Sequence, residues 1–142
     1  MKILKTLSDP NPLSIDWVCI ARIVVGGYFI MHGKGLFNAA DMAGFTKYLA
    51  NDLHFPMPTL MAYLRTGAEF FGGIMLVLGL YTRVGAFLIM FTMLVAAFTA
   101  AKGDLIGEGE TVVVYAVFCL TFILVGSGKY SLDAYLSAKK NG

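Results

Sequence analysis

Four long apolar stretches constrain the fold of this chain more than any other feature. They cover residues 15–37, 60–80, 83–101 and 110–125. The hydrocarbon core of a bilayer is about 30 Å thick, and a helix of about 20 mostly apolar residues crosses it. Because lipid offers the backbone no hydrogen-bond partner, such segments have to be helical. The pattern predicts an all-α integral membrane protein with four transmembrane helices packed as an antiparallel bundle.

The composition agrees with a membrane protein. Hydrophobic residues make up 58% of the 142 residues and charged residues 14%, whereas a soluble domain is about half apolar and a quarter charged. No proline-rich, serine-rich or charged linker divides the chain, so we expect a single domain over residues 1–142. The net charge is only +2 and the basic residues are scattered, which argues against nucleic acid as a partner. The expected partner is the lipid bilayer.

The connections predict how the helices are joined. Tyr81 and Thr82 alone separate the second and third stretches, so these two should form a tight antiparallel hairpin. Within residues 41–53, apolar side chains recur at helical spacing opposite polar ones. This pattern predicts a short amphipathic helix at the membrane interface between the first and second spans. Pro56 and Pro58 should end it before the second span.

The basic residues near the helix ends predict the orientation. In the predicted topology, the side that carries the termini has Lys2, Lys5, Arg83, Lys129, Lys139 and Lys140. The other side has Lys34, Lys47 and Lys102, together with five acidic residues. Lysine and arginine are enriched in cytoplasmic loops. Both termini are therefore predicted to be cytoplasmic, and the amphipathic segment should face outward.

Several ionisable residues lie inside the apolar stretches. A charge at bilayer depth costs about 2.5 to 3.5 kcal/mol on insertion scales, so each should have a partner or a water-filled cavity. Arg65 and Glu69 are four residues apart and can pair on one helix face. If the first two spans are antiparallel neighbours, His32 lies near the depth of Arg65, and Glu69 lies about one turn deeper. We therefore predict a polar cluster of Arg22, His32, Arg65 and Glu69, in which Glu69 pairs with at least one of the cations.

This cluster has two interpretations. In the structural one, buried ion pairs fix the helix register, while Arg22 or Lys34 extends to the headgroup region. In the functional one, the cluster is a pocket for a small lipid-soluble ligand such as a quinone, whose carbonyl oxygens accept hydrogen bonds and whose ring stacks on aromatic side chains. The candidate binding residues are then Arg22, His32, Lys34, Arg65 and Glu69.

Cofactor motifs are missing from the sequence. His32 and His54 have no second His or Glu at i+3 or i+4, so no metal site is predicted, and there is no dinucleotide motif. Cys19 and Cys119 form no C-x-x-C pair. We expect no intrinsic cofactor. Glycines in the first two spans indicate close helix packing, either within one chain or across a homo-oligomer.

Three segments carry a family resemblance: R-(x)9-H-G-K-G-L-F, A-E-F-F-G-G-I-M-L-V-L-G-L-Y-T-R, and G-S-G-K-Y-S-L-D-A-Y-L. Together they resemble the DoxX family of bacterial four-helix membrane proteins, which is named for a subunit of an archaeal thiosulfate:quinone oxidoreductase. The resemblance implies a bacterial inner-membrane subunit of a redox system, with quinone as its ligand and a partner protein that completes electron transfer. Such a chain would be an oxidoreductase subunit rather than a complete enzyme. The alternative is a non-redox scaffold or transporter-like component whose polar cluster is structural.

Overall fold

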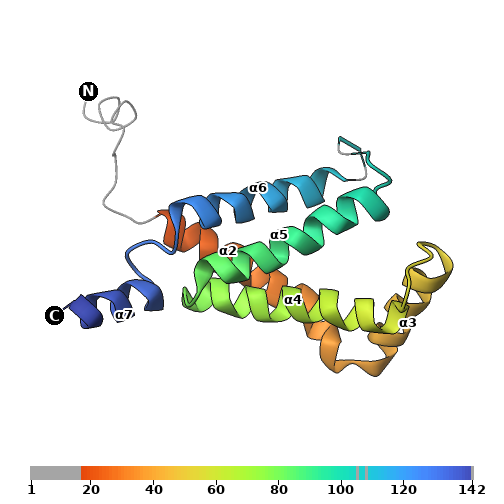
Figure 1. The fold of residues 1–142 in the computed structure, drawn as a ribbon, viewed down its shortest axis with the longest axis horizontal. Helices are drawn as coiled ribbons and strands as arrows, with labels where there is room; N and C mark the ends of the chain where they lie inside the picture. The colour runs from red at the N-terminus through yellow and green to blue at the C-terminus, as the bar shows by residue number, and fades with distance from the viewer. Residues whose placement is uncertain (1–16, 105, 108, 142) are drawn as a thin grey trace.

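The computed structural model describes residues 17–104, 106–107 and 109–141. Every regular element in these ranges is a helix (Figure 1). The long helices are α2 (Trp17–Gly33), α4 (Pro58–Leu78), α5 (Thr82–Thr99) and α6 (Glu110–Val125), and the short ones are η1 (Lys34–Phe37), α3 (Ala39–Asn51) and α7 (Leu132–Asn141). The long helices match the four predicted stretches, although residues 15 and 16 lie outside the described ranges. Helix α7 was not predicted.

Two of the described helices are long and apolar enough to cross a membrane. Helix α4 has 21 residues and α5 has 18, close to the length that spans a hydrocarbon core. Helix α6 is a shorter apolar helix of 16 residues, and the described part of α2 has 17. The all-helical fold is therefore confirmed, and the crossing of all four helices stays a prediction.

The long helices pack in chain order around one apolar core. Helix α2 lies against α4, α4 against α5, and α5 against α6, whereas α2 and α6 meet at few points (Figure 1). All four contribute buried side chains to the core, namely Val25, Phe29, Leu76, Ala86, Ile89, Met93, Cys119 and Phe122. The bundle is consequently open along the edge between α2 and α6.

Glycines let α2 and α4 approach backbone to backbone. A Cβ atom on Gly73 would lie 2.7 Å from the carbonyl oxygen of Gly26, and one on Gly33 would lie 2.6 Å from the Cα of Phe70. No side chain fits at such distances, so these positions require glycine. The pairing also shows that α2 and α4 are antiparallel. Close packing within one chain, one of the two predicted roles of the glycines, is confirmed here.

Helix α3 confirms the predicted amphipathic helix, but its apolar face packs against α4 rather than facing lipid alone. Asn38 caps its N-terminus, because its side-chain oxygen accepts a hydrogen bond of 3.0 Å from the Ala40 N–H. Its apolar residues Met42 and Leu49 are 3% and 6% exposed and pack in a cluster with Ala62 of α4. The periodicity predicts an apolar face, but it does not say whether lipid or protein buries that face.

The turn between α4 and α5 depends on a left-handed glycine. Gly79 has a φ of +64° and ends α4. Its N–H donates to the Leu76 carbonyl, and the Leu80 N–H donates to the Met75 carbonyl at 3.1 Å. This is the Schellman arrangement, in which glycine adopts the left-handed conformation without a steric penalty. The turn makes the predicted antiparallel hairpin of α4 and α5.

Candidate functional site

Arg65 and Glu69 form an ion pair on α4. Arg65 Nη2 lies 3.0 Å from Glu69 Oε1, and the Glu69 side chain is only 3% exposed. The predicted pairing of Glu69 is confirmed. Apart from this contact, Oε1 accepts no hydrogen bond from the described residues. A buried carboxylate oxygen thus retains the capacity to accept a hydrogen bond.

Arg65 is also held from the other side by α3. Its Cζ atom lies 4.7 Å from the centre of the Phe45 ring, a distance at which a guanidinium is attracted to an aromatic face. About a third of the Arg65 side chain is exposed, at 36%. The cation therefore links α3 to α4 at the edge of the bundle and keeps one face open to its surroundings.

His32 lies near the end of α2, within about one helical turn of the level of Glu69. It directly precedes Gly33, which contacts Phe70, and Phe70 directly follows Glu69. The contacts of Gly33 with Phe70 and of Ile30 with Gly73 put His32 level with Phe71, so the predicted register, with His32 level with Arg65, is wrong by about 9 Å along the helix. The close glycine contact sets the observed register.

A row of aromatic rings extends from His32 across to α6. The Tyr28 ring centre lies 4.4 Å from that of His32 and 4.8 Å from that of Tyr115, on which it stacks. Phe29 meets the edge of Tyr115 at 5.2 Å. The sequence did not single out Tyr115 as part of an aromatic wall. The available signal was that Tyr115 is the only tyrosine within the apolar run of α6.

Arg22 is buried at the opposite end of α4. It is 1% exposed, and its guanidinium donates to the carbonyls of Leu76, at 2.8 Å, and Tyr130, at 2.9 Å. Leu76 is seven residues beyond Glu69, which is about 10 Å along a helix. The predicted grouping of Arg22 with Glu69 is therefore wrong. Antiparallel packing places Arg22 beside the C-terminal carbonyls of α4, where a cation also complements the helix dipole.

Lys34 begins the short helix η1 and is exposed. It follows α2 directly and so lies at the same end of the bundle as His32. Of the five candidate residues, the structure places Arg65, Glu69 and His32 along the middle of α4, with Lys34 beyond the end of α2. It places Arg22 near the C-terminal end of α4.

The segment after α6 fastens onto the turn between α4 and α5. The Asp133 carboxylate accepts hydrogen bonds from the backbone N–H groups of Tyr81, at 2.8 Å, and Thr82, at 3.0 Å. The Asp133 N–H donates to the Gly79 carbonyl at 2.9 Å. Together with the bond from Arg22 to Tyr130, these contacts connect the beginning of α7 with three of the long helices. Much of the family-like sequence at this end therefore has a structural role.

Comparison with known proteins places the chain in a family. The family model described as DoxX matches residues 17–102. A protein of Bacillus subtilis (strain 168) named "Putative oxidoreductase CatD" is 28% identical over 125 residues, which cover 87% of this chain and 90% of that protein. An "Uncharacterized protein" of Haemophilus influenzae is 32% identical over 126 residues, covering 82% of this chain and 88% of that protein. No solved structure matches. The chain belongs to the DoxX family of membrane-associated proteins.

Proposed function

We propose that this protein is an integral membrane subunit of a redox system that binds a quinone or a similar lipid-soluble compound. Its family and its similarity to a protein named as an oxidoreductase support the link to redox chemistry. The proposal includes a bacterial inner-membrane location with four crossing helices and cytoplasmic termini. Because the sequence has no dinucleotide or metal motif, a partner protein completes electron transfer.

The observation that carries the proposal is that the Glu69 carboxylate is buried and can accept a further hydrogen bond. Its buried Oε1 lies 3.0 Å from Arg65 Nη2 and accepts no further hydrogen bond among the described residues, and Glu69 lies within about one helical turn of the level of His32. These features suit a small ring that carries hydrogen-bonding oxygens and packs against aromatic walls. Bound there, a quinone would supply two-electron redox chemistry.

In this proposal the residues of the chain have separate tasks. The His32 ring N–H donates a hydrogen bond to a ligand oxygen, and Glu69 accepts one from a hydroxyl of the reduced, quinol form of the ligand. Arg65 provides positive charge beside them, and Phe45 and Glu69 fix its orientation. Lys34 remains a candidate at the edge of the site. Arg22 takes no part, because backbone carbonyls occupy its terminal nitrogens.

A second candidate is a non-redox scaffold or transporter-like component. Two observations favour it. Arg22 donates a hydrogen bond to a backbone carbonyl and so has a structural role. Arg65 already contacts both the Glu69 carboxylate and the Phe45 ring. In that case His32 and Glu69 contact no ligand. Ligand binding therefore separates the two functions directly.

Replacement of Glu69 with glutamine tests the role of its carboxylate. Gln keeps the shape and removes the charge, so we expect about tenfold weaker binding of a short-tailed quinol analogue, whose hydroxyl donates to Glu69, and this corresponds to about 1.4 kcal/mol. Stability should fall by only about 1 kcal/mol, because Arg65 is partly exposed and can turn toward water or headgroups. Isothermal titration and thermal unfolding in detergent measure the two effects. Unchanged affinity would remove Glu69 from the binding site.

Cysteine labelling in intact cells tests the proposed orientation. In a background without Cys19 and Cys119, Lys47→Cys should react with an impermeant maleimide, and Lys140→Cys should react only after the cells are opened. The expectation follows from the distribution of basic residues at the two sides. Labelling of Lys140→Cys in intact cells would refute cytoplasmic termini.

A further inference from the structure

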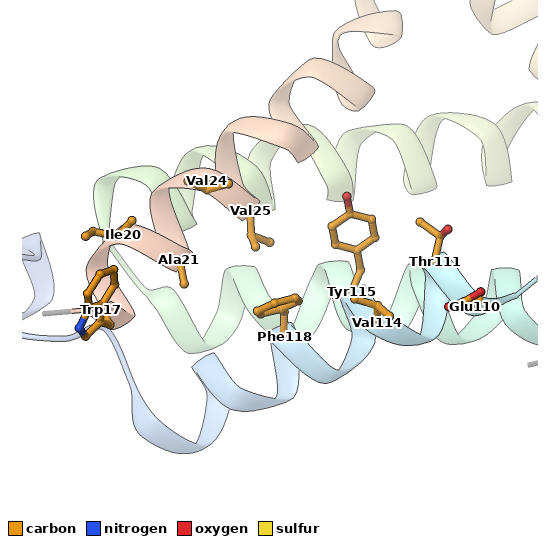
Figure 2. Close-up of a pocket in the computed structure, with 10 residues that line it drawn as sticks. All are labelled: Trp17, Ile20, Ala21, Val24, Val25, Glu110, Thr111, Val114, Tyr115 and Phe118. Atoms are coloured by element: carbon orange, nitrogen blue, oxygen red, sulfur yellow. The ribbon is translucent and has the colours of Figure 1, made fainter. Parts of the chain in front are cut away.

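The open edge between α2 and α6 forms a groove. It has a volume of about 760 Å³ and is lined by one side of α2 from Trp17 to Val25 and one side of α6 from Glu110 to Phe118 (Figure 2). Ligand pockets in proteins commonly have volumes of about 300 to 1,000 Å³. The groove exists because these two helices share the core below but touch each other at few points.

The polar side chains of the groove gather at one end. Glu110, Thr111 and the Tyr115 hydroxyl lie toward one end, whereas Trp17 and Ile20 line the other (Figure 2). Glu110 is the only charged residue among those that line the groove. Apart from the indole N–H of Trp17 at the far end, the remaining length offers neither charge nor a strong hydrogen-bonding group, so it suits a neutral hydrocarbon chain.

The polar end of the groove leads to the proposed binding site. Tyr115 lines the groove and stacks on Tyr28 with ring centres 4.8 Å apart. Tyr28 in turn lies 4.4 Å from His32, measured between ring centres. The row of rings is therefore a continuous surface from the groove to the level of Glu69.

We propose that the groove between α2 and α6 binds the linear hydrocarbon tail of the lipid-soluble compound, with the tail directed from Tyr115 toward Trp17. This inference rests on the proposed function, in which the ring of that compound lies near His32. It makes the ligand class more specific, because a compound with a ring and a long unbranched or isoprenoid tail fits both regions at once. If the ligand were a short polar compound, it would not reach the groove, and the acyl chains of membrane lipids would fill the groove instead.

The size of the groove favours a chain over a helix. From Trp17 to Val25 the groove follows α2 for about 12 Å, at about 1.5 Å per residue. A helix is about 10 Å wide, so it would lie partly outside this open groove. An extended hydrocarbon chain is narrower and can follow the groove.

The position of the end of the tail tests this proposal better than the affinity of the protein for the tailed compound. Bilayer lipid is as apolar as the groove, so a tail gains packing contacts but little hydrophobic free energy when it moves from lipid into protein. A tail that occupies the groove should nevertheless have a defined end point. A photoreactive group at the tip of the tail can report that point.

The experiment uses the full chain in lipid nanodiscs and two photoreactive probes. The first is a quinone analogue with a diazirine at the end of a ten-carbon tail, and the second is a fatty acid with the same diazirine. Mass spectrometry locates the labelled residues. The quinone probe should label the Trp17 to Val24 part of α2, and an excess of tailless quinone analogue should reduce that labelling at least fivefold.

Groove-filling variants provide the matched control. Val114 lines the groove, whereas Val117 is an exposed valine of the same helix that does not line it. Val114→Trp should reduce labelling of α2 by the quinone probe at least fivefold, and Val117→Trp should leave it unchanged. Binding of the tailless analogue should be equal in both variants, because the ring site is intact.

The possible results separate the two proposals. Labelling spread evenly over exposed residues such as Phe91 of α5, together with normal binding of the tailless analogue, would overturn the groove and leave the proposed function standing. Equal groove labelling by both probes, without competition by the tailless analogue, would overturn the ring site and with it this inference. A change of oligomeric state in Val114→Trp with no groove labelling in the wild type would assign the groove to a second copy instead.

Discussion

Replacing Arg22 with methionine is expected to lower the free energy of unfolding by about 3 kcal/mol. The change removes the hydrogen bonds from the guanidinium to the carbonyls of Leu76 and Tyr130, which are 2.8 and 2.9 Å long. Bonds to a charged group contribute about 1.5 to 3 kcal/mol each, and a buried acceptor that is left without a donor adds a penalty. Methionine fills most of the space but donates no hydrogen bond. Thermal unfolding in detergent should show a melting temperature lower by about 8 °C.

Arg83→Met is the matched control for this substitution. Arg83 is exposed near the same end of the bundle, so its replacement should change stability by less than about 0.5 kcal/mol. Equal melting temperatures of the two variants would show that Arg22 does not hold α2, α4 and the segment after α6 together.

Replacing Gly73 with alanine is expected to destabilise the protein by about 3 kcal/mol. The added Cβ would lie 2.7 Å from the Gly26 carbonyl oxygen and 2.8 Å from the Ile30 nitrogen. Both are backbone atoms within α2, so the overlap can be relieved only by moving one helix away from the other. Overpacking in a well-packed core typically costs about 1 to 3 kcal/mol, and backbone contact places this site at the upper end. Thermal unfolding in detergent measures the change.

Gly67→Ala in the same helix is the control. A Cβ at Gly67 would meet nothing within 4 Å, and alanine is a better helix former than glycine by about 1 kcal/mol. This variant should be as stable as the wild type or slightly more stable. A similar loss of stability in both variants would indicate a general intolerance of α4 to substitution and would contradict the close α2–α4 contact.

The helices and the Arg65–Glu69 pair could be predicted because both depend on local spacing. An apolar run of suitable length predicts a helix wherever it packs, and residues four apart meet on any helix. The ends of α4, α5 and α6 accordingly fall within two residues of the predicted stretches. These features do not require knowledge of neighbouring helices.

The role of Arg22 and the depth of His32 could not be predicted in the same way. The partners of Arg22 are backbone carbonyls, which every residue has and no motif marks. The depth of His32 depends on the contact between Gly33 and Phe70, which shifts α2 by about 9 Å along α4 relative to the predicted register. Both depend on how two helices slide along each other.

Tertiary contacts also determine which groups bury the apolar face of each helix. Helix α3 was predicted from its periodicity, but only the structure shows Met42 and Leu49 packed with Ala62 rather than in lipid. The stacking of Tyr115 on Tyr28 brings together side chains that are far apart in the sequence. A single sequence contains no signal for that contact.

Binding of a short-tailed quinone analogue to the wild type and to His32→Ala tests the proposed ligand site most directly. His54→Ala is the matched control, because His54 is exposed in the connection before α4 and its Nδ1 lies 3.2 Å from the Ala50 carbonyl oxygen. Loss of one hydrogen bond to the ligand corresponds to about 1.4 kcal/mol, or a tenfold change in Kd. Isothermal titration should give about tenfold weaker binding to His32→Ala and unchanged binding to His54→Ala. Equal affinity in all three proteins would remove His32 from the site, and no binding to any of them would contradict the quinone proposal and favour the scaffold.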